Sequence, residues 1–235
     1  MKTYTLYTCT GQLQLRPGRA GVQEPVVVLN RREQGMEPAE LTLWSRLCWR
    51  FRDREQLRRD FEAAGQILPP EKQEEAAFDH LLGRLMARGL IVAGEGDSQV
   101  DALYDLLGNL YVMPIDNSFF ARLTAYARLA STHRASPAAA KKLLKKDRPS
   151  EQEQRILSLA RQAMLSTAEL VKCEETNARD ISDSGKLLDA LYYDDATTCY
   201  NIAHLMRSSP KRDGVVLAVS NLYLRKQILF QRVCL

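Results

Sequence analysis

The chain has 235 residues, of which 45% are hydrophobic and 26% are charged, and its formal net charge is +4. This composition is typical of a packed globular protein, and the length allows one large domain or two small ones. No run of about eighteen apolar residues occurs, so we expect no membrane-spanning helix. Residues 1–9 are polar and alternating and lack the apolar core of a signal peptide, so we expect a cytoplasmic protein.

Five cysteines lie at irregular spacing, and an odd, irregular set argues against a disulfide framework. We expect buried thiols in a reducing compartment. The sequence contains no Cys-x-x-Cys and no His-x-x-x-His, and its three histidines are far apart. We therefore expect no metal and no cofactor.

Motifs of common enzyme classes are also missing. There is no Gly-x-Ser-x-Gly, no phosphate-binding Gly-x-x-x-x-Gly-Lys-Ser/Thr, and no Gly-x-Gly-x-x-Gly after a predicted strand. Acidic pairs such as Asp194-Asp195 are better explained as helix caps or solvated charges than as an acid–base couple. We expect a protein without enzyme activity.

The first third of the chain predicts short strands followed by three helices. Residues 4–8 and 11–16 alternate with a period of two, and residues 25–29 are β-branched and expected to be buried. The first helix begins near Glu37 with a proline at an early position. The second helix spans 54–64, and the third spans about 71–88.

The stretch from Phe78 to Gly96 is the most informative of the chain. Its apolar residues recur at three- and four-residue steps until Gly89, which is suited to close a helix. Residues 90–93 then predict a short strand, and Gly94 to Gly96 predict a tight turn. This order is typical of the end of a winged helix-turn-helix.

The remainder predicts mostly helices. Helical periodicity returns at 101–107, and residues 110–115 read as extended, at a sheet edge. Further helices are expected over 119–129, 137–146, 185–193, 196–206 and 215–233. The serines of two capping boxes, Ser150 and Ser166, predict helix starts at Glu151 and Thr167.

We therefore predict an α+β, mostly α fold. It comprises a winged helix-turn-helix domain with N-terminal strands over residues 1–116 and an all-α domain over residues 117–235. A second, degenerate helix-turn-helix from about residue 150 is a further expectation.

Two groups of residues are candidates for DNA binding. The exposed face of the third predicted helix offers His80, Arg84 and Arg88 for base edges or phosphates. Its first half is acidic, and a core helix with ordinary solvent charges explains the pattern equally well. The basic segment Lys141, Lys142, Lys145, Lys146 and Arg148 suits phosphate contacts. The alternative interpretation of this basic segment is a solvated helix or a linker.

Residues 11 to about 95 resemble the PqqD-like proteins, small winged-helix RiPP recognition elements that bind leader peptides. The resemblance rests on the strands 11–16 and 25–30, on Leu41–Trp44, on the helix 55–61, and on the closing segment 78–91. Bacterial winged-helix transcriptional regulators have the same order of elements. This resemblance implies a binding protein.

Two functions follow. The first is a DNA-binding transcriptional regulator whose partner is double-stranded DNA and whose helical domain senses a ligand or forms a homodimer. The second is a peptide- or protein-binding module in which an extended partner adds to the edge of the N-terminal sheet, with Val26, Val27, Val28 and Leu29 as the contact residues. The basic segments favour the regulator by a narrow margin.

Overall fold

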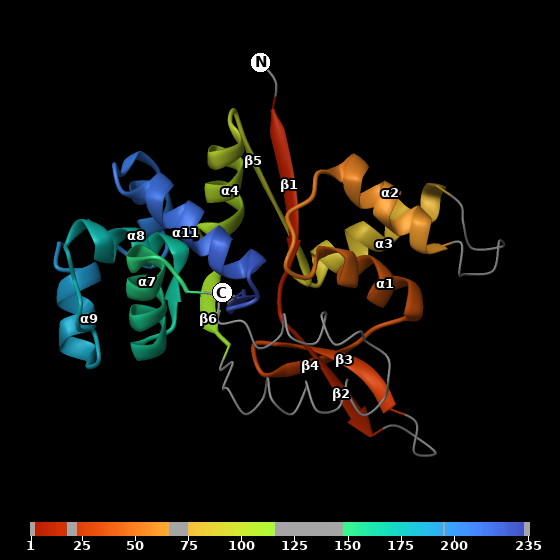
Figure 1. Ribbon diagram of the computed structural model, residues 1–235, viewed down its shortest axis with the longest axis horizontal. Helices are drawn as coiled ribbons and strands as arrows, with labels where there is room; N and C mark the ends of the chain where they lie inside the picture. Colours follow the sequence, from red (N-terminus) through yellow and green to blue (C-terminus); the bar gives the residue numbers. More distant parts are fainter. Residues whose placement is uncertain (1–2, 18–22, 66–74, 116–147, 195, 233–235) are drawn as a thin grey trace.

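The computed structural model describes residues 3–17, 23–65, 75–115, 148–194 and 196–232, which form a mixed α/β protein (Figure 1). The first half contains β1 (Tyr4–Cys9), β2 (Gln12–Pro17), β3 (Gln23–Leu29), β4 (Arg32–Gly35), α1 (Pro38–Leu47), α2 (Arg54–Gly65), α3 (Glu75–Ala87) and β5 (Ile91–Gly96). The second half contains α4 (Gln99–Leu107), β6 (Tyr111–Pro114), α7 (Glu151–Gln162), β7 (Leu165–Ser166), α8 (Thr167–Glu175), α9 (Ser184–Leu191), α10 (Ile202–Leu205), the 3-10 turn η3 (Met206–Ser208), α11 (Arg212–Leu224) and β8 (Ile228–Gln231).

The N-terminal sheet is antiparallel with the order β2-β3-β4. Val27 and Leu29 of β3 are buried in a hydrophobic cluster with residues of α1, α2 and α3. Asn30 and Arg31 connect β3 to β4 with φ angles of 51° and 64°. Positive φ at both positions is typical of two-residue hairpin turns, whose twist matches that of the strands.

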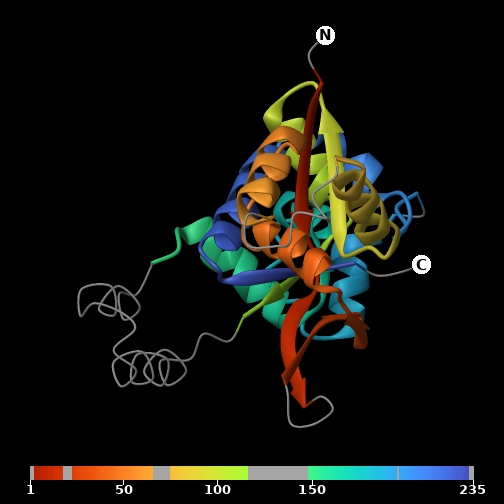
Figure 2. The ribbon, with the colours of Figure 1, turned by 90° about the vertical axis from the view of Figure 1, so that its right-hand side faces the viewer.

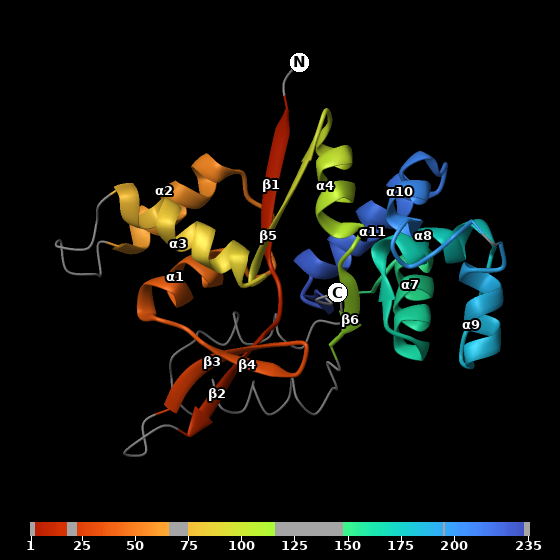
Figure 3. The ribbon, with the colours of Figure 1, turned by 180° about the vertical axis from the view of Figure 1, so that it is seen from behind.

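β1 pairs with β5 between two groups of helices. The two strands are antiparallel, with Tyr4 opposite Gly96 and Cys9 opposite Ile91. Figures 1 and 3 place α1, α2 and α3 on one side of this pair and α4, α11 and α7–α9 on the other. The pair therefore forms the boundary between two packed halves.

Gly94 and Gly96 lie within β5, so the expected tight turn at these residues is wrong. α4 packs against this strand at very short range. A Cβ atom on Gly94 would lie 2.2 Å from the backbone nitrogen of Leu106. The two glycines serve the close approach of a helix to a strand rather than a change of chain direction.

The second half contains a sheet, so the expected all-α domain is also wrong. Its order is β7-β6-β8, and both pairings are antiparallel. β6, expected at an edge, is the central strand. The terminal helix expected over 215–233 ends at Leu224, and β8 follows because Ile228 and Phe230 alternate into the core.

The buried side chains form two hydrophobic clusters. The first unites β1, β3, α1, α2, α3 and the start of β5. The second begins with Tyr104 of α4 and includes Val112 of β6 together with α7, α8, α11 and β8. α4 and β6 therefore belong to the second core, and the division between the cores falls before α4 rather than at residue 116.

Local signals for the helices have mixed outcomes. Both capping boxes are confirmed, because Ser150 and Ser166 each accept a hydrogen bond from the backbone three residues on. The helix expected over 196–206 is largely wrong, since only Ile202–Leu205 is α-helical. The helices expected over 119–129 and 137–146 lie outside the described residues.

Candidate functional site

Arg84 and Arg88, the two arginines expected to contact DNA, are held by one buried carboxylate. Glu40 is 1% exposed, and its oxygens lie 3.0 Å from Nη2 of Arg84 and 3.1 Å from Nη1 of Arg88. The same carboxylate accepts a hydrogen bond from the backbone N–H of Glu37 at the start of α1. Arg88 also donates to the carbonyl oxygen of Gly35 at 2.6 Å. These contacts tie α3 to α1 and β4.

The remaining exposed positions of α3 offer little to an anionic partner. From Phe78 to Ala87 they are Asp79, His80, Gly83 and Ala87. Asp79 accepts hydrogen bonds from Arg54 at 2.9 Å and from Arg58 at 3.5 Å. His80 is exposed, but no lysine or arginine accompanies it among these exposed positions. Within its described side chains, α3 has no cationic face.

Two other predicted groups are placed in part. Lys141, Lys142, Lys145 and Lys146 lie outside the described residues, and Arg148 is exposed just before α7. Val26, Val27, Val28 and Leu29 belong to β3, which pairs with β2 on one side and β4 on the other. Their backbone is therefore not at an edge, and an added strand would have to pair with β2 or β4. The hydrophobic run identified the strand but not its place in the sheet.

The structure instead has an open groove between the N-terminal sheet and the second sheet, which we call the inter-sheet groove. Its volume is about 550 Å³. Two methionines line one wall, and both are solvent-exposed: Met113 of β6 by 37% and Met164 by 55%. The lining residues are Val28, Leu29, Asn30, Arg31, Arg32, Gln34, Met113, Met164 and Gln231.

Hydrogen bonds fix the two walls of the inter-sheet groove relative to each other. The backbone N–H of Asn30 donates to Oε1 of Gln231 at 3.0 Å, and its side-chain amide donates to the carbonyl oxygen of Arg232. On the far wall, Met113 is in register with Leu229 of β8. The hairpin turn is thus anchored to the end of β8, and the groove is built by both halves.

The rim of the inter-sheet groove is cationic. Arg31 and Arg32 line it, and neither has an ion-pair partner among the residues that the structure describes. None of the described lining residues carries a carboxylate. An apolar floor beside two unpaired guanidinium groups suits a ligand that combines apolar side chains with negative charge.

Sequence reasoning missed this groove. Met113 was part of a predicted strand, and Met164 follows a predicted helix, so neither stood out. Asn30 provided the one local signal, because asparagine is favoured at positive φ in hairpin turns. The groove arises from contacts between residues about two hundred positions apart, such as Asn30 and Gln231.

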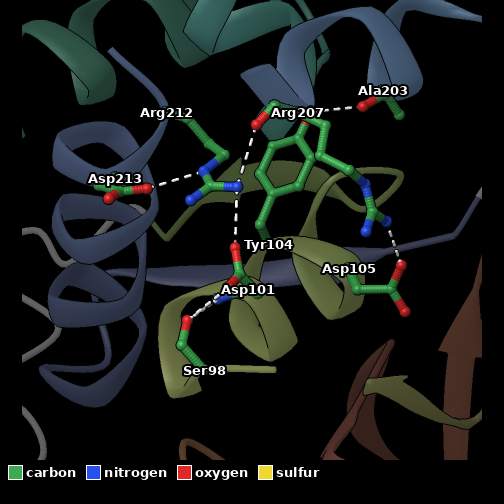
Figure 4. A network of polar contacts seen from close by, with 8 residues as sticks. All are labelled: Ser98, Asp101, Tyr104, Asp105, Ala203, Arg207, Arg212 and Asp213. Carbon is green, nitrogen blue, oxygen red and sulfur yellow. Dashed lines mark hydrogen bonds and ion pairs between the residues drawn. The ribbon is translucent and has the colours of Figure 1, made fainter. Parts of the chain in front are cut away.

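A second polar cluster joins α4 to the region of η3 and α11 (Figure 4). The guanidinium groups of Arg207 and Arg212 lie 6.0 and 5.7 Å from the ring centroid of Tyr104. Arg207 pairs with Asp105 at 2.6 Å, and Arg212 pairs with Asp101 at 2.9 Å and with Asp213. The arginines are neutralised within the cluster, which is therefore structural rather than an anion site.

Two titrating groups of this cluster are perturbed. Burial raises the pKa of Tyr104 to about 12, although Arg207 and Arg212 oppose the shift. The hydroxyl of Tyr104 donates to the carbonyl oxygen of Ala203 at 2.6 Å. The hydrogen bond from the Ser98 hydroxyl holds the pKa of Asp101 below its usual value; burial opposes this shift, and the charge of Arg212 supports it.

The described residues contain no group of three or more histidine, cysteine or acidic side chains placed to hold a metal ion. None of the described helices has both the length and the apolar composition needed to cross a bilayer. No family model, no curated protein and no solved structure matches this chain.

Proposed function

We propose that this protein is a non-enzymatic binding module that captures an extended segment of a peptide or protein partner in the inter-sheet groove. The observation that carries this proposal is the pair of exposed methionines, Met113 and Met164, in a groove whose rim carries two arginines without an ion-pair partner among the described residues. Methionine is flexible and polarisable, and it suits surfaces that pack against varied apolar side chains.

The edge of β4 offers a backbone for pairing beside the groove. Among the described strands, β4 pairs only with β3. The carbonyl oxygen of Gly35 already accepts a hydrogen bond from Arg88, so a bound segment would pair along Arg32 to Gln34. Strand addition supplies affinity through the main chain, while alternate side chains enter the groove and give specificity.

The order of elements supports the same proposal. β2, β3 and β4 precede α1, α2, α3 and β5, as in the PqqD-like proteins that the N-terminal part resembles. We propose on this order that β2 to β5, with α1, α2 and α3, form a winged helix-turn-helix. The second, degenerate helix-turn-helix from about residue 150 stays a prediction; α7 and α8, joined by β7, are the helices that would form it.

Fluorescence polarisation with short labelled peptides tests the groove. The peptides alternate leucine with glutamate, with serine or with lysine. We expect the leucine–glutamate peptide to bind most tightly and the leucine–lysine peptide not to bind. Met164→Glu should weaken binding of the first peptide at least tenfold, about 1.4 kcal/mol, because it removes an apolar contact and places a carboxylate beside the glutamates of the peptide.

The matched control is Leu188→Glu on α9, because Leu188 and Met164 are both 55% exposed. It should leave peptide affinity unchanged. Equal loss of binding in the two variants, or equal binding of all three peptides, would contradict the proposal.

A DNA-binding regulator is the second candidate, and the basic segment from Lys141 to Arg148 favours it. With Arg84 and Arg88 engaged by Glu40, affinity would come from phosphate contacts of the basic segments. Binding to random-sequence duplex DNA over a salt series separates the candidates. The regulator requires log K to fall with log salt by about 0.9 per phosphate contact, and charge reversal at Lys141 and Lys145 should reduce that slope. The groove proposal expects peptide affinity to survive the same reversal.

A further inference from the structure

β2 forms the outer edge of the N-terminal sheet, on the side opposite β4. Its one strand partner within the described part of the chain is β3. The end of β2 that lies farthest from β1 projects beyond α1, α2 and α3 (Figures 1 and 2). A projecting edge presents unpaired backbone N–H and C=O groups, which are a template for another strand unless the sequence prevents pairing.

The side chains of β2 do not prevent pairing. Leu13 and Leu15 are 44% and 61% exposed. Alternate residues of a strand share a face, so both leucines lie on the face of Val27, with which Leu13 is in register. Val27 is fully buried. The two leucines therefore continue the apolar face of the sheet past the cover of the helices.

The strand is complementary to itself. A two-fold axis through Gln14 that pairs two copies of β2 in antiparallel register places Leu13 opposite Leu15 of the second copy, and Leu15 opposite its Leu13. Gln14 then faces Gln14, and Gln12 faces Arg16. Both leucines gain apolar cross-strand partners, which stabilise antiparallel pairs.

Charge is compatible with this register. Arg16 already forms an ion pair with Glu33 at 2.6 Å. Opposite it lies the neutral amide of Gln12, so no two cations meet across the axis. The neighbouring two-fold registers are poorer, because an axis at Leu13 leaves Leu15 facing Gly11, and an axis at Leu15 leaves Leu13 facing Pro17.

We propose that the protein forms a homodimer through antiparallel pairing of β2 with β2 of a second copy, centred on Gln14. The dimer joins two three-stranded sheets into one continuous sheet. The edge of β4 and the inter-sheet groove stay open on each copy, so the dimer presents two grooves to one partner. The inference does not depend on what the groove binds.

Analytical ultracentrifugation over a concentration series tests the association. One short strand pair and four leucines form a small interface, so we expect a micromolar dissociation constant. Leu15→Lys should shift the equilibrium to monomer by at least tenfold. Leu188→Lys on α9 is the control, since Leu188 is similarly exposed on another surface, and it should leave the equilibrium unchanged. Circular dichroism establishes that each variant is folded.

Cysteine cross-linking tests the register. In a background with Cys199→Ser and Cys234→Ser, Gln14→Cys should give a disulfide-linked dimer under mild oxidation, because directly paired Cβ atoms lie about 4.5–5.5 Å apart. Gln12→Cys alone should cross-link far less, whereas Gln12→Cys mixed with Arg16→Cys should cross-link efficiently. A monomer throughout the concentration series, or a dimer unaffected by Leu15→Lys, would overturn the proposal. Equal cross-linking of Gln12→Cys and Gln14→Cys would overturn the register.

Discussion

The phenolic oxygen of Tyr223, near the end of α11, accepts a hydrogen bond from the backbone N–H of Trp49 at 3.0 Å. It donates to the carbonyl oxygen of Leu47 at 3.1 Å, and Oγ1 of Thr8 lies 3.0 Å away. Trp49 has a φ of 53°, a conformation that costs energy for a residue with a side chain. One buried hydroxyl of the second core therefore holds the end of α1 and β1 of the first.

Tyr223→Phe should destabilise the protein by about 1–3 kcal/mol, because it leaves the partly buried Trp49 N–H without its acceptor and removes one of the two donors to the Leu47 carbonyl, the other being the Arg50 N–H. Urea denaturation measures the change. Tyr193→Phe is the control, since Tyr193 is 67% exposed, and it should have almost no effect. Equal urea midpoints for wild type and Tyr223→Phe would contradict this prediction.

Glu40→Gln should also destabilise the fold, by about 1–3 kcal/mol, because a buried acceptor of two guanidinium groups loses its charge. The partial exposure of Arg84 and Arg88, at 40% and 29%, keeps the effect below that of a fully buried pair. The control is His80→Ala on α3, the helix that carries Arg84, and it should change the free energy of unfolding by less than about 0.5 kcal/mol. A stable Glu40→Gln variant would free both arginines for the DNA-binding role.

Gly94→Ala should be among the most damaging single changes, because its Cβ would lie 2.2 Å from the nitrogen of Leu106. Overpacking of this kind costs about 1–3 kcal/mol or more. Gly83→Ala on α3 is the opposite case, since a Cβ there meets nothing within 4 Å. It should stabilise the helix by up to about 1 kcal/mol. Thermal melting of the two variants should shift in opposite directions.

Alkaline pH should weaken the contact between α4 and the segment before α11. An unfolded tyrosine titrates near 10, whereas Tyr104 in the folded protein titrates at about 12. Its contribution to stability is complete below pH 10 and is lost as the pH rises to 12, since the unfolded state releases the proton first. Tyr104→Phe should lose this part of the pH dependence. The difference in phenolate absorbance between wild type and variant, followed from pH 9 upward, measures the titration of Tyr104, and urea denaturation at each pH measures the stability.

The sequence predicted the features that depend on neighbouring residues. Both capping boxes, the left-handed Gly89 that follows α3 and the strand after it need only local hydrogen bonds and periodicity. Long-range pairing was not accessible. The sequence around Ile228 and Phe230 predicts the end of a helix, because no neighbouring residue indicates that these two pair with β6.

The candidate site also divides into features that depend on neighbouring residues and features that depend on long-range contacts. Arg84 and Arg88 occupy the face that periodicity assigned to them, but only the fold reveals that Glu40 of another helix lies beneath them. The inter-sheet groove was invisible for the same reason. Its methionines and its arginines come from segments that have no relationship until both sheets have formed.

The central place of β6 constrains the order in which the chain can fold during synthesis. β6 emerges from the ribosome about a hundred residues before β8, the strand that covers one of its edges. Until β8 is complete, that edge of β6 lacks its partner strand, so the second core depends on the last strand that the structure describes. The first core, except for its contact with Tyr223, can form earlier. A nascent chain halted before residue 228 should therefore be protected from protease in its first half and digested in its second.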